Sequence, residues 1–591
     1  MQLSRSKSTL GQLINLLWAQ GNWSELAALQ EDLAQSSDTE LTAKEYAYIA
    51  LAFLQQGQFD EGKKLLANLL VGINSQVDVE QAENLMDKQQ MAALLLSGCC
   101  TSLSNARFMS GDDNRAQQLA VQAVKLTEPE VLQETVSQLR SIWQQKRLHQ
   151  AGLEFRGKPL QKAEFNAELS YQLAVGEAWA GNTVNTVIFR HHGIFSHNGM
   201  QYTAFYVDEH TLRLVQRDLT SNELIFADIN GNYNIKDAHN SISLGMDRDG
   251  YLHISYDHHG TQLKYRRSLD PYSIDGFSHE LEMTGQREMK VTYPAFLMPI
   301  GDEPLQLLYR DGNHQKGAAY IKRYSEAQQR WSDSDSPILA GDTNQPWTSN
   351  AYWNHPVRDS EGNGHISFIW RTHHIGEQQQ INNMNICYAK TFDNGRSWYS
   401  SNNKPFKLPI TQVNAEVVWP ISPASNLINQ TSMATDSQNR PHIVFYANDE
   451  NGIAQYQHLW FDGRKWQQQV ISNRTFAFDL CGGGTLRIPI SRPEIVIDKQ
   501  DNVFVIYRGD LTGDCMAALC LKAPHYKYHP VNQQILYPEP LGLAEPVIDR
   551  LRWQQEQVLS LLLQYNDQPN HDVGHANVVK PIYIVDVVFN V

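Results

Sequence analysis

The chain has 591 residues, 41% of them hydrophobic and 10% aromatic, which is too long for one ordinary core and favours two or more domains. Its formal net charge of -15 argues against a nucleic-acid partner, so an anionic substrate would need a local basic pocket. The six cysteines lack the paired spacing of a secreted disulfide framework, and no apolar run is long enough to span a membrane.

Residues 1–20 begin with basic side chains but contain no uninterrupted apolar segment and no small-residue cleavage site. No signal peptide is therefore expected, and the expected location of the protein is the cytoplasm.

Residues 1–150 carry apolar side chains at helical spacing, for example Leu10, Leu13 and Leu17. The related phrases WAQGNWSELAAL and FLQQGQFDEGKKLL place Gly21 and Gly57 36 residues apart, near the period of about 34 residues of tetratricopeptide-type hairpins. A generic helical bundle would give a similar pattern, and both interpretations stay open. We predict an all-α, helical-repeat N-terminal domain that binds a protein partner or supports oligomerisation.

Residues 151–165 lose the helical period and contain Gly157 and Pro159, which is typical of a linker. Beyond it, an apolar strand that ends in an aromatic residue recurs at spacings of 50 to 76 residues. The seven copies are TAFYVD, ISYDHH, LLYRDG, FIWRTH, VFYAND, VIYRGD and LQYND. They predict an all-β domain over residues 166–591, a seven-bladed β-propeller with four-stranded blades. The phrase TFDNGRSWYS at 391–400 matches the structural Asp-box pattern of sialidase-like propellers.

Two histidines, His239 and His259, lie at the expected ends of neighbouring strands, where a β scaffold carries its chemistry. The polar residues after the recurrent aromatics should share one face of the disc, because each blade presents the same strand end there. They include Arg310, Arg371 and Arg508, which predict a local anion site. Arg–Asp bridges between blades are the structural alternative for each arginine.

Three longer phrases resemble the BNR-repeat propeller proteins that include ulvan lyases: HNSISLGMDRDGYLHISYDHHG, VTYPAFLMPIGDEPLQLLYRDGNHQKG and SRPEIVIDKQDNVFVIYRGD. The resemblance extends over about residues 165–591 and does not include the helical part. It implies that His239, His259, Tyr293 and Arg310 are the catalytic residues. The implied activity is that of a polysaccharide lyase on a uronic-acid-containing, ulvan-like glycan, sulfated or not.

Elimination at a uronate explains these residue types. A guanidinium that pairs with the carboxylate stabilises the enolate-like intermediate, which suits Arg310. A neutral imidazole can remove the C5 proton, which suits His239, and a phenol can protonate the leaving oxygen, which suits Tyr293. His and Tyr can exchange these roles with the substrate epimer, and His259 would orient the substrate or the base. No metal or organic cofactor is required for this step.

Four further residues are candidates for substrate binding: Arg371, Arg508, His258 and Asn240. Structural alternatives accompany the catalytic candidates, because His239 could cap a turn through Asn240 and Tyr293 could be an ordinary strand aromatic. Three histidines hold the same place before an apolar Ile in their repeats and are interpreted as structural: His253, His365 and His442.

Some members of the resembling family carry a structural zinc bound by histidine and cysteine, and the corresponding residues here are His314, His373 and Cys387. A fourth ligand is not evident, and His374 or His355 could supply it.

Two alternatives to the lyase stay open. A sialidase-like glycoside hydrolase would use three arginines and a Tyr/Glu pair, and no such pair stands out in the sequence. A non-catalytic propeller that binds glycan or protein would need no acid–base set, so the presence of all four catalytic candidates argues against it. Secreted ulvan lyases carry export signals, and no signal peptide is expected here. This difference favours imported oligosaccharides or an intracellular polysaccharide as the substrate.

Overall fold

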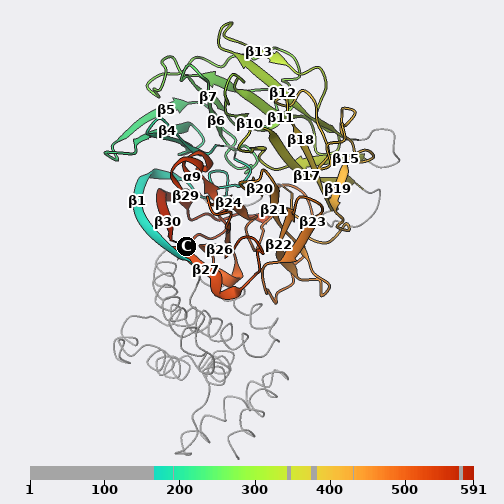
Figure 1. The fold of residues 1–591 in the computed structure, drawn as a ribbon. Helices are drawn as coiled ribbons and strands as arrows, with labels where there is room; N and C mark the ends of the chain where they lie inside the picture. Colours follow the sequence, from blue (N-terminus) through green and yellow to red (C-terminus); the bar gives the residue numbers. More distant parts are fainter. Residues whose placement is uncertain are drawn as a thin grey trace, which may run out of the picture. The chain divides into compact units, whose positions relative to one another are not determined.

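The computed structural model describes residues 165–190, 192–341, 348–373, 382–429, 432–570 and 577–590. These residues belong to one unit of the chain, Lys162–Val591, and form seven antiparallel sheets that are the blades of a β-propeller (Figure 1). The seven blades predicted from the recurrent aromatic phrase are confirmed.

Most paired strands follow one another in the sequence, with exceptions such as β7 with β9 and β8 with β10. The first sheet contains β2 (Ile194–His197), β3 (Met200–Tyr206), β4 (Thr211–Asp218) and β5 (Leu224–Asn230). The second contains β6 (Ser243–Met246), β7 (Leu252–Ser255) and β9 (Tyr265–Arg267). The third contains β8 (His259–Thr261), β10 (Val291–Leu297), β11 (Gln306–Gly312), β12 (Gly317–Ser325), β13 (Arg330–Asp333) and β14 (Leu339–Ala340).

The remaining sheets complete the ring. They contain β15 (Thr348–Trp353), β16 (Val357–Arg358), β17 (Gly364–His373), β18 (Asn383–Thr391) and β19 (Glu416–Trp419); β20 (Ser432–Thr435), β21 (Pro441–Asn448), β22 (Ala454–Phe461) and β23 (Trp466–Val470); β24 (Glu494–Ile497), β25 (Val503–Arg508), β26 (Cys515–Leu521) and β27 (Gln533–Pro540); and β28 (Val547–Ile548), β29 (Val558–Gln564), β30 (Val579–Asn590) and β1 (Asn166–Trp179).

The last blade joins the two ends of the propeller. Strand β1 pairs with β30 from Asn166↔Asn590 to Trp179↔Val579, so the first described strand completes the sheet of the last ones. Figure 1 shows β1 and β30 side by side, in the colours of the two ends of the described chain. Because this pairing closes the ring, the inner strands of all seven blades surround one axis.

The recurrent aromatic residue lies within the last four residues of a strand in each blade or directly after that strand. Six of these side chains are buried: Tyr206, Tyr256, Tyr309, Trp370, Tyr446 and Tyr507. They belong to hydrophobic clusters that join neighbouring sheets, for example the cluster that contains both Tyr206 and Tyr256. The recurrent aromatic residue in the sequence therefore corresponds to a side chain that packs one blade against the next.

The three blade histidines are buried in hydrogen-bonded sets, which supports their structural interpretation. His253 lies with Nε2 3.1 Å from Asp247 Oδ2 and Nδ1 2.7 Å from the Tyr265 hydroxyl. The corresponding sets are His365 with Asp359 and Tyr388, and His442, which hydrogen-bonds His458 and lies with Nε2 3.5 Å from Asp436 Oδ2. In each set the carboxylate comes from the turn six residues before the histidine, so the contact fixes the turn to the strand.

The expected fold class, an all-α helical-repeat domain followed by the propeller, needs correction. The structure shows an all-β propeller, and within the described residues the one α-helix is α9 (Arg550–Glu556), beside two short 3₁₀ turns, η1 (Asp510–Thr512) and η2 (Pro530–Asn532). The helical repeat was expected at 1–150, which lies outside the described residues. The domain boundaries at 150 and 165 stay predictions.

Among the residues that the structure describes, no helix has the length and apolar character needed to cross a bilayer.

Candidate functional site

An open cavity of about 720 Å³ lies on one face of the propeller and is lined by residues of several blades. The strand pairing explains why these residues meet. Ser243, at the start of β6, pairs with Ser255, at the end of β7, so the segment before an inner strand and the segment after a second strand reach the same face. His239 precedes β6 and His259 follows β7, and both line the cavity.

The structure brings the four predicted catalytic residues together around this cavity: His239, His259, Tyr293 and Arg310. They come from two adjacent blades and are distributed over 72 residues of sequence. Phe189 and Tyr352 complete the aromatic part of the lining, with ring centroids 5.2 and 6.3 Å from that of Tyr293.

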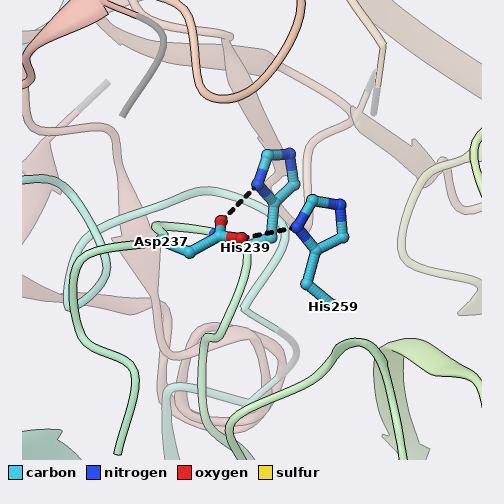
Figure 2. A group of neighbouring side chains, drawn as sticks. All are labelled: Asp237, His239 and His259. Atoms are coloured by element: carbon cyan, nitrogen blue, oxygen red, sulfur yellow. Dashed lines mark hydrogen bonds and ion pairs between the residues drawn. The ribbon is translucent and has the colours of Figure 1, made fainter. Parts of the chain in front are cut away.

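A single carboxylate, that of Asp237, contacts both histidines. Figure 2 shows each ring directing its Nδ1 atom at this carboxylate, with Nδ1 of His239 2.7 Å from Oδ1 and Nδ1 of His259 2.5 Å from Oδ2. The two rings are stacked, with their centroids 4.1 Å apart. Burial would raise the pKa of Asp237, but the hydrogen bonds from the two imidazoles and their electrostatic attraction for the carboxylate outweigh it and hold the pKa well below its ordinary value.

Arg310 is 2% exposed, and its Nε and Nη1 atoms have no hydrogen-bond partner among the described residues. Its guanidinium carbon lies 5.0 Å from the ring centroid of Tyr293 and 5.8 Å from that of Tyr352. A Cβ atom at Gly317 would come within 2.7 Å of Arg310 Cδ, so this glycine leaves the room that the side chain occupies. A buried guanidinium with unmet donors is costly, which makes Arg310 a candidate to bind an anionic group in the cavity.

Tyr293 lies in β10 at a break in the strand register between Thr292 and Ala295. Its φ is 54°, a left-handed conformation that a bulky residue rarely adopts. Bulges and strained residues of this kind often direct a side chain at a functional site. The ring centroid of Tyr293 lies 6.1 Å from that of His239, so the phenol and the imidazole face the same space.

Arg371 also lines the cavity and is held by neutral groups. Its Nε donates to Asn383 Oδ1 at 2.8 Å, Nη1 to the Tyr352 hydroxyl at 3.2 Å and Nη2 to Asn429 Oδ1 at 3.1 Å. No ion pair between Arg371 and a described carboxylate is present, so its charge adds to that of Arg310. The lining therefore carries two guanidiniums that attract an anion.

The other three candidates for substrate binding do not line the cavity. Arg508 is fully buried and donates to Ala544 O, Pro489 O and Asp514 Oδ1. His258 accepts from the backbone N–H of Lys264, and burial lowers its pKa to about 3. Asn240 donates to the carbonyl of Asn234 and thereby holds the loop that carries His239. These contacts favour structural roles, and their predicted part in substrate binding has no support from their position.

Several lining residues were not predicted from the sequence. Arg492 and Glu545 form a buried ion pair at the cavity wall, with Nε 2.7 Å from Oε1. Thr485 lies in the glycine-rich connection between β23 and β24, with Oγ1 3.3 Å from His239 Nδ1. The run of three glycines was visible in the sequence, and Asp237 stands two residues before His239 and could have been noticed there.

Asp237, His239 and His259 are the one group in the described part of the chain whose carboxylate and imidazole atoms lie close enough to share a metal ion.

The predicted zinc ligands are described only in part. His314 is exposed at the cavity, whereas Cys387 is fully buried in a cluster that includes Phe368 and Trp370. His355 lies elsewhere, with Nε2 3.0 Å from Ile188 O. The side chain of His373 and residue His374 lie outside the described residues, so the zinc site stays a prediction.

The sequence matches the model of BNR repeat-containing family members over residues 200–474. No protein of curated function shows significant sequence similarity to the chain. Among solved structures, polysaccharide lyase Uly1 is similar with a TM-score of 0.54 and 12% identity over 71% of this chain and 99% of that chain.

Two other solved structures are more distant. An ulvan lyase of family PL25, bound to -[GlcA(1-4)Rha3S]-, has a TM-score of 0.49 and 14% identity over 70% of this chain and 95% of that chain. An α-L-arabinanase from Penicillium chrysogenum, complexed with arabinobiose, has a TM-score of 0.35 and 10% identity over 71% and 98%. At these identities the likeness concerns the fold alone, and the fold of this chain is one that it shares with polysaccharide lyase Uly1.

Proposed function

We propose that the protein is a polysaccharide lyase that cleaves a uronic-acid-containing glycan by β-elimination in the cavity. The observation that carries the proposal is the buried guanidinium of Arg310, whose Nε and Nη1 have no partner among the described residues and which lies beside Tyr293. A substrate carboxylate would meet the unmet donors of Arg310 with charge-assisted hydrogen bonds. The matching BNR repeats and the fold shared with a polysaccharide lyase support the same reaction class.

The elimination assigns one task to each side chain. Arg310 pairs with the carboxylate, so that negative charge developing on it during removal of the C5 proton is stabilised. The imidazole of His239 accepts that proton, the C4–O bond breaks, and its electrons stay with the leaving oxygen as the C4=C5 double bond forms. The hydroxyl of Tyr293 gives its proton to the leaving oxygen, and each acid–base group contributes about 10²–10⁴ in rate. Tyr293 and His239 exchange these tasks for the opposite C5 epimer.

Carboxylate placement favours elimination over glycoside hydrolysis. Most glycosidases need two carboxyl groups on either side of the scissile bond. Among the described residues that line the cavity, Glu545 is the one carboxylate, and Arg492 binds it through two hydrogen bonds. Asp237 is likewise engaged by two imidazoles. A lyase uses the imidazole, phenol and guanidinium that the cavity does present.

The test is to mix the purified full chain with a panel of uronate polysaccharides and short oligosaccharides. An unsaturated uronate absorbs in the near ultraviolet, and a hydrolysis product does not. We expect the absorbance to rise with wild-type protein and the rate to fall about 10²–10⁴-fold in His239→Gln and Tyr293→Phe. The matched controls are His210→Gln and Tyr272→Phe, which change exposed side chains and should keep the wild-type rate.

New reducing ends without absorbance would replace the lyase with a hydrolase. Glycan binding without any product across the panel would favour the non-catalytic propeller. Equal rates in the wild type and both cavity variants would show that the elimination takes place elsewhere.

A further inference from the structure

Asp237 does not line the cavity itself, but its carboxylate contacts two histidines that do, His239 and His259. Its Oδ1 atom accepts from the backbone N–H of His239 at 3.0 Å and lies 2.7 Å from His239 Nδ1, while Oδ2 lies 2.5 Å from His259 Nδ1. The side chain of Asp237 is only 20% exposed. The two contacts therefore occupy both oxygens of one partly buried carboxylate.

An ionised carboxylate has only acceptors, so each imidazole must present an N–H at Nδ1. In a neutral imidazole the basic lone pair is then on Nε2, on the far side of each ring from Asp237. The rings are stacked with centroids 4.1 Å apart, so one carboxylate sets the tautomer of two neighbouring rings.

We propose that Asp237 is the positioning residue of the site, which fixes both imidazoles in the Nδ1–H tautomer and leaves Nε2 of each ring as the basic atom. This rests on the proposed lyase, in which Nε2 of His239 takes the proton from C5. His239 then removes the proton with Nε2. Asp237, which already contacts the Nδ1–H of this ring, stabilises the imidazolium that forms.

Other charged and titratable groups also face the pair. Tyr293 lies beside His239, and Arg310 lies beside Tyr293. Burial, and then the charges of the Arg310 and Arg371 guanidiniums, lower the pKa of His314, which lines the same cavity. Glu545 is neutralised by Arg492. Asp237 is thus the negative group in contact with the two rings.

The contacts make the effect of Asp237→Asn asymmetric. Oδ1 accepts from the backbone N–H of His239, so the amide oxygen keeps this place and the NH₂ group takes the place of Oδ2. The NH₂ group then donates to Nδ1 of His259, which must move its proton to Nε2, while His239 keeps its Nδ1–H. A substitution that only disturbed the fold would not select one ring.

The experiment is ¹⁵N NMR of the full chain labelled at histidine, without substrate, with His239→Gln and His259→Gln used to assign the two rings. We expect Nδ1–H on both rings in the wild type, and Nε2–H on His259 alone in Asp237→Asn. Asp249→Asn, an exposed carboxylate in the same blade, is the matched control and should leave both tautomers unchanged. Nε2–H on either ring in the wild type, or no change in Asp237→Asn, would overturn the proposal.

Kinetics provide a second readout where the glycan substrate is known. Asp237→Asn should lower kcat roughly 100-fold with little change in KM, and Asp237→Glu should restore part of the loss because it restores the charge. An unchanged kcat would contradict the positioning role. The NMR result does not depend on turnover, so a failure of the lyase proposal and a failure of this one are distinguishable.

Discussion

The molecule contains two kinds of Asp–His set, and they differ in what the surroundings leave available. In the second blade, Asp247, His253 and the Tyr265 hydroxyl satisfy one another in a fully buried position. At the cavity, Asp237 binds two imidazoles that remain partly exposed, beside the unmet guanidinium donors of Arg310. The same residue types thus hold a blade together in one place and present acid–base groups in the other. Access and unmet hydrogen-bonding capacity, rather than residue type, distinguish the set that we propose to be functional.

The largest expected effect is at Arg310. Arg310→Met removes the group that would bind the substrate carboxylate, and we expect kcat/KM on a uronate glycan to fall about 10³-fold. The same change removes a buried charge without a described partner, so the free energy of unfolding should rise by about 1–2 kcal/mol. Activity on the glycan and urea-induced unfolding measure the two effects. A loss of stability would show that Arg310 has a structural partner.

In the second blade we expect a substitution to lower stability and leave activity unchanged. His253→Gln breaks the buried contacts to Asp247 and Tyr265 and should lower the free energy of unfolding by about 1–3 kcal/mol. Because His253 does not line the cavity, kcat at a temperature where the variant is folded should match that of the wild type. Urea-induced unfolding and steady-state rates, compared with His210→Gln, provide the test. A selective loss of kcat would mean that the blade set also acts in catalysis.

A smaller effect concerns the pH dependence of stability, which we expect to come from buried histidines that do not line the cavity. Burial lowers the pKa of His192, His258 and His355 to about 3, whereas the unfolded value is about 6.5. The unfolded chain therefore binds more protons below pH ~6.5, so this contribution to stability is complete above that pH and is lost as the pH falls. The limiting slope is about 1.4 kcal/mol per pH unit for each histidine.

The measurement is the Tm between pH 5 and pH 8 for the wild type, His258→Asn and the exposed control His210→Gln, in steps of about half a unit. His258→Asn should weaken the acid dependence of the Tm, and the control should not. Equal dependence in all three proteins would mean that His258 does not contribute to it.

Much of the propeller could be predicted because its signals are local. A strand that ends in an aromatic residue needs only its own alternation and the turn before it, and the same packing recurs at Tyr206, Tyr256 and Tyr309. The closing pair of β1 and β30 has no local signal, since its partners are about 400 residues apart. The catalytic candidates were identified by the resemblance of their phrases to a family, and the structure brings them into one cavity.

The sequence by itself determined the seven blades and the phrases that carry His239, His259, Tyr293 and Arg310. Only the tertiary structure decided which similar residues face the cavity. Arg371 and Arg508 hold equivalent strand ends, but carbonyls of the connection before β24 bind Arg508, whereas neutral side chains support Arg371 in the lining. Asp237 gained its second imidazole in the same way. The reason is physical: local patterns place a side chain on a strand end, but its partners come from segments that only folding brings beside it.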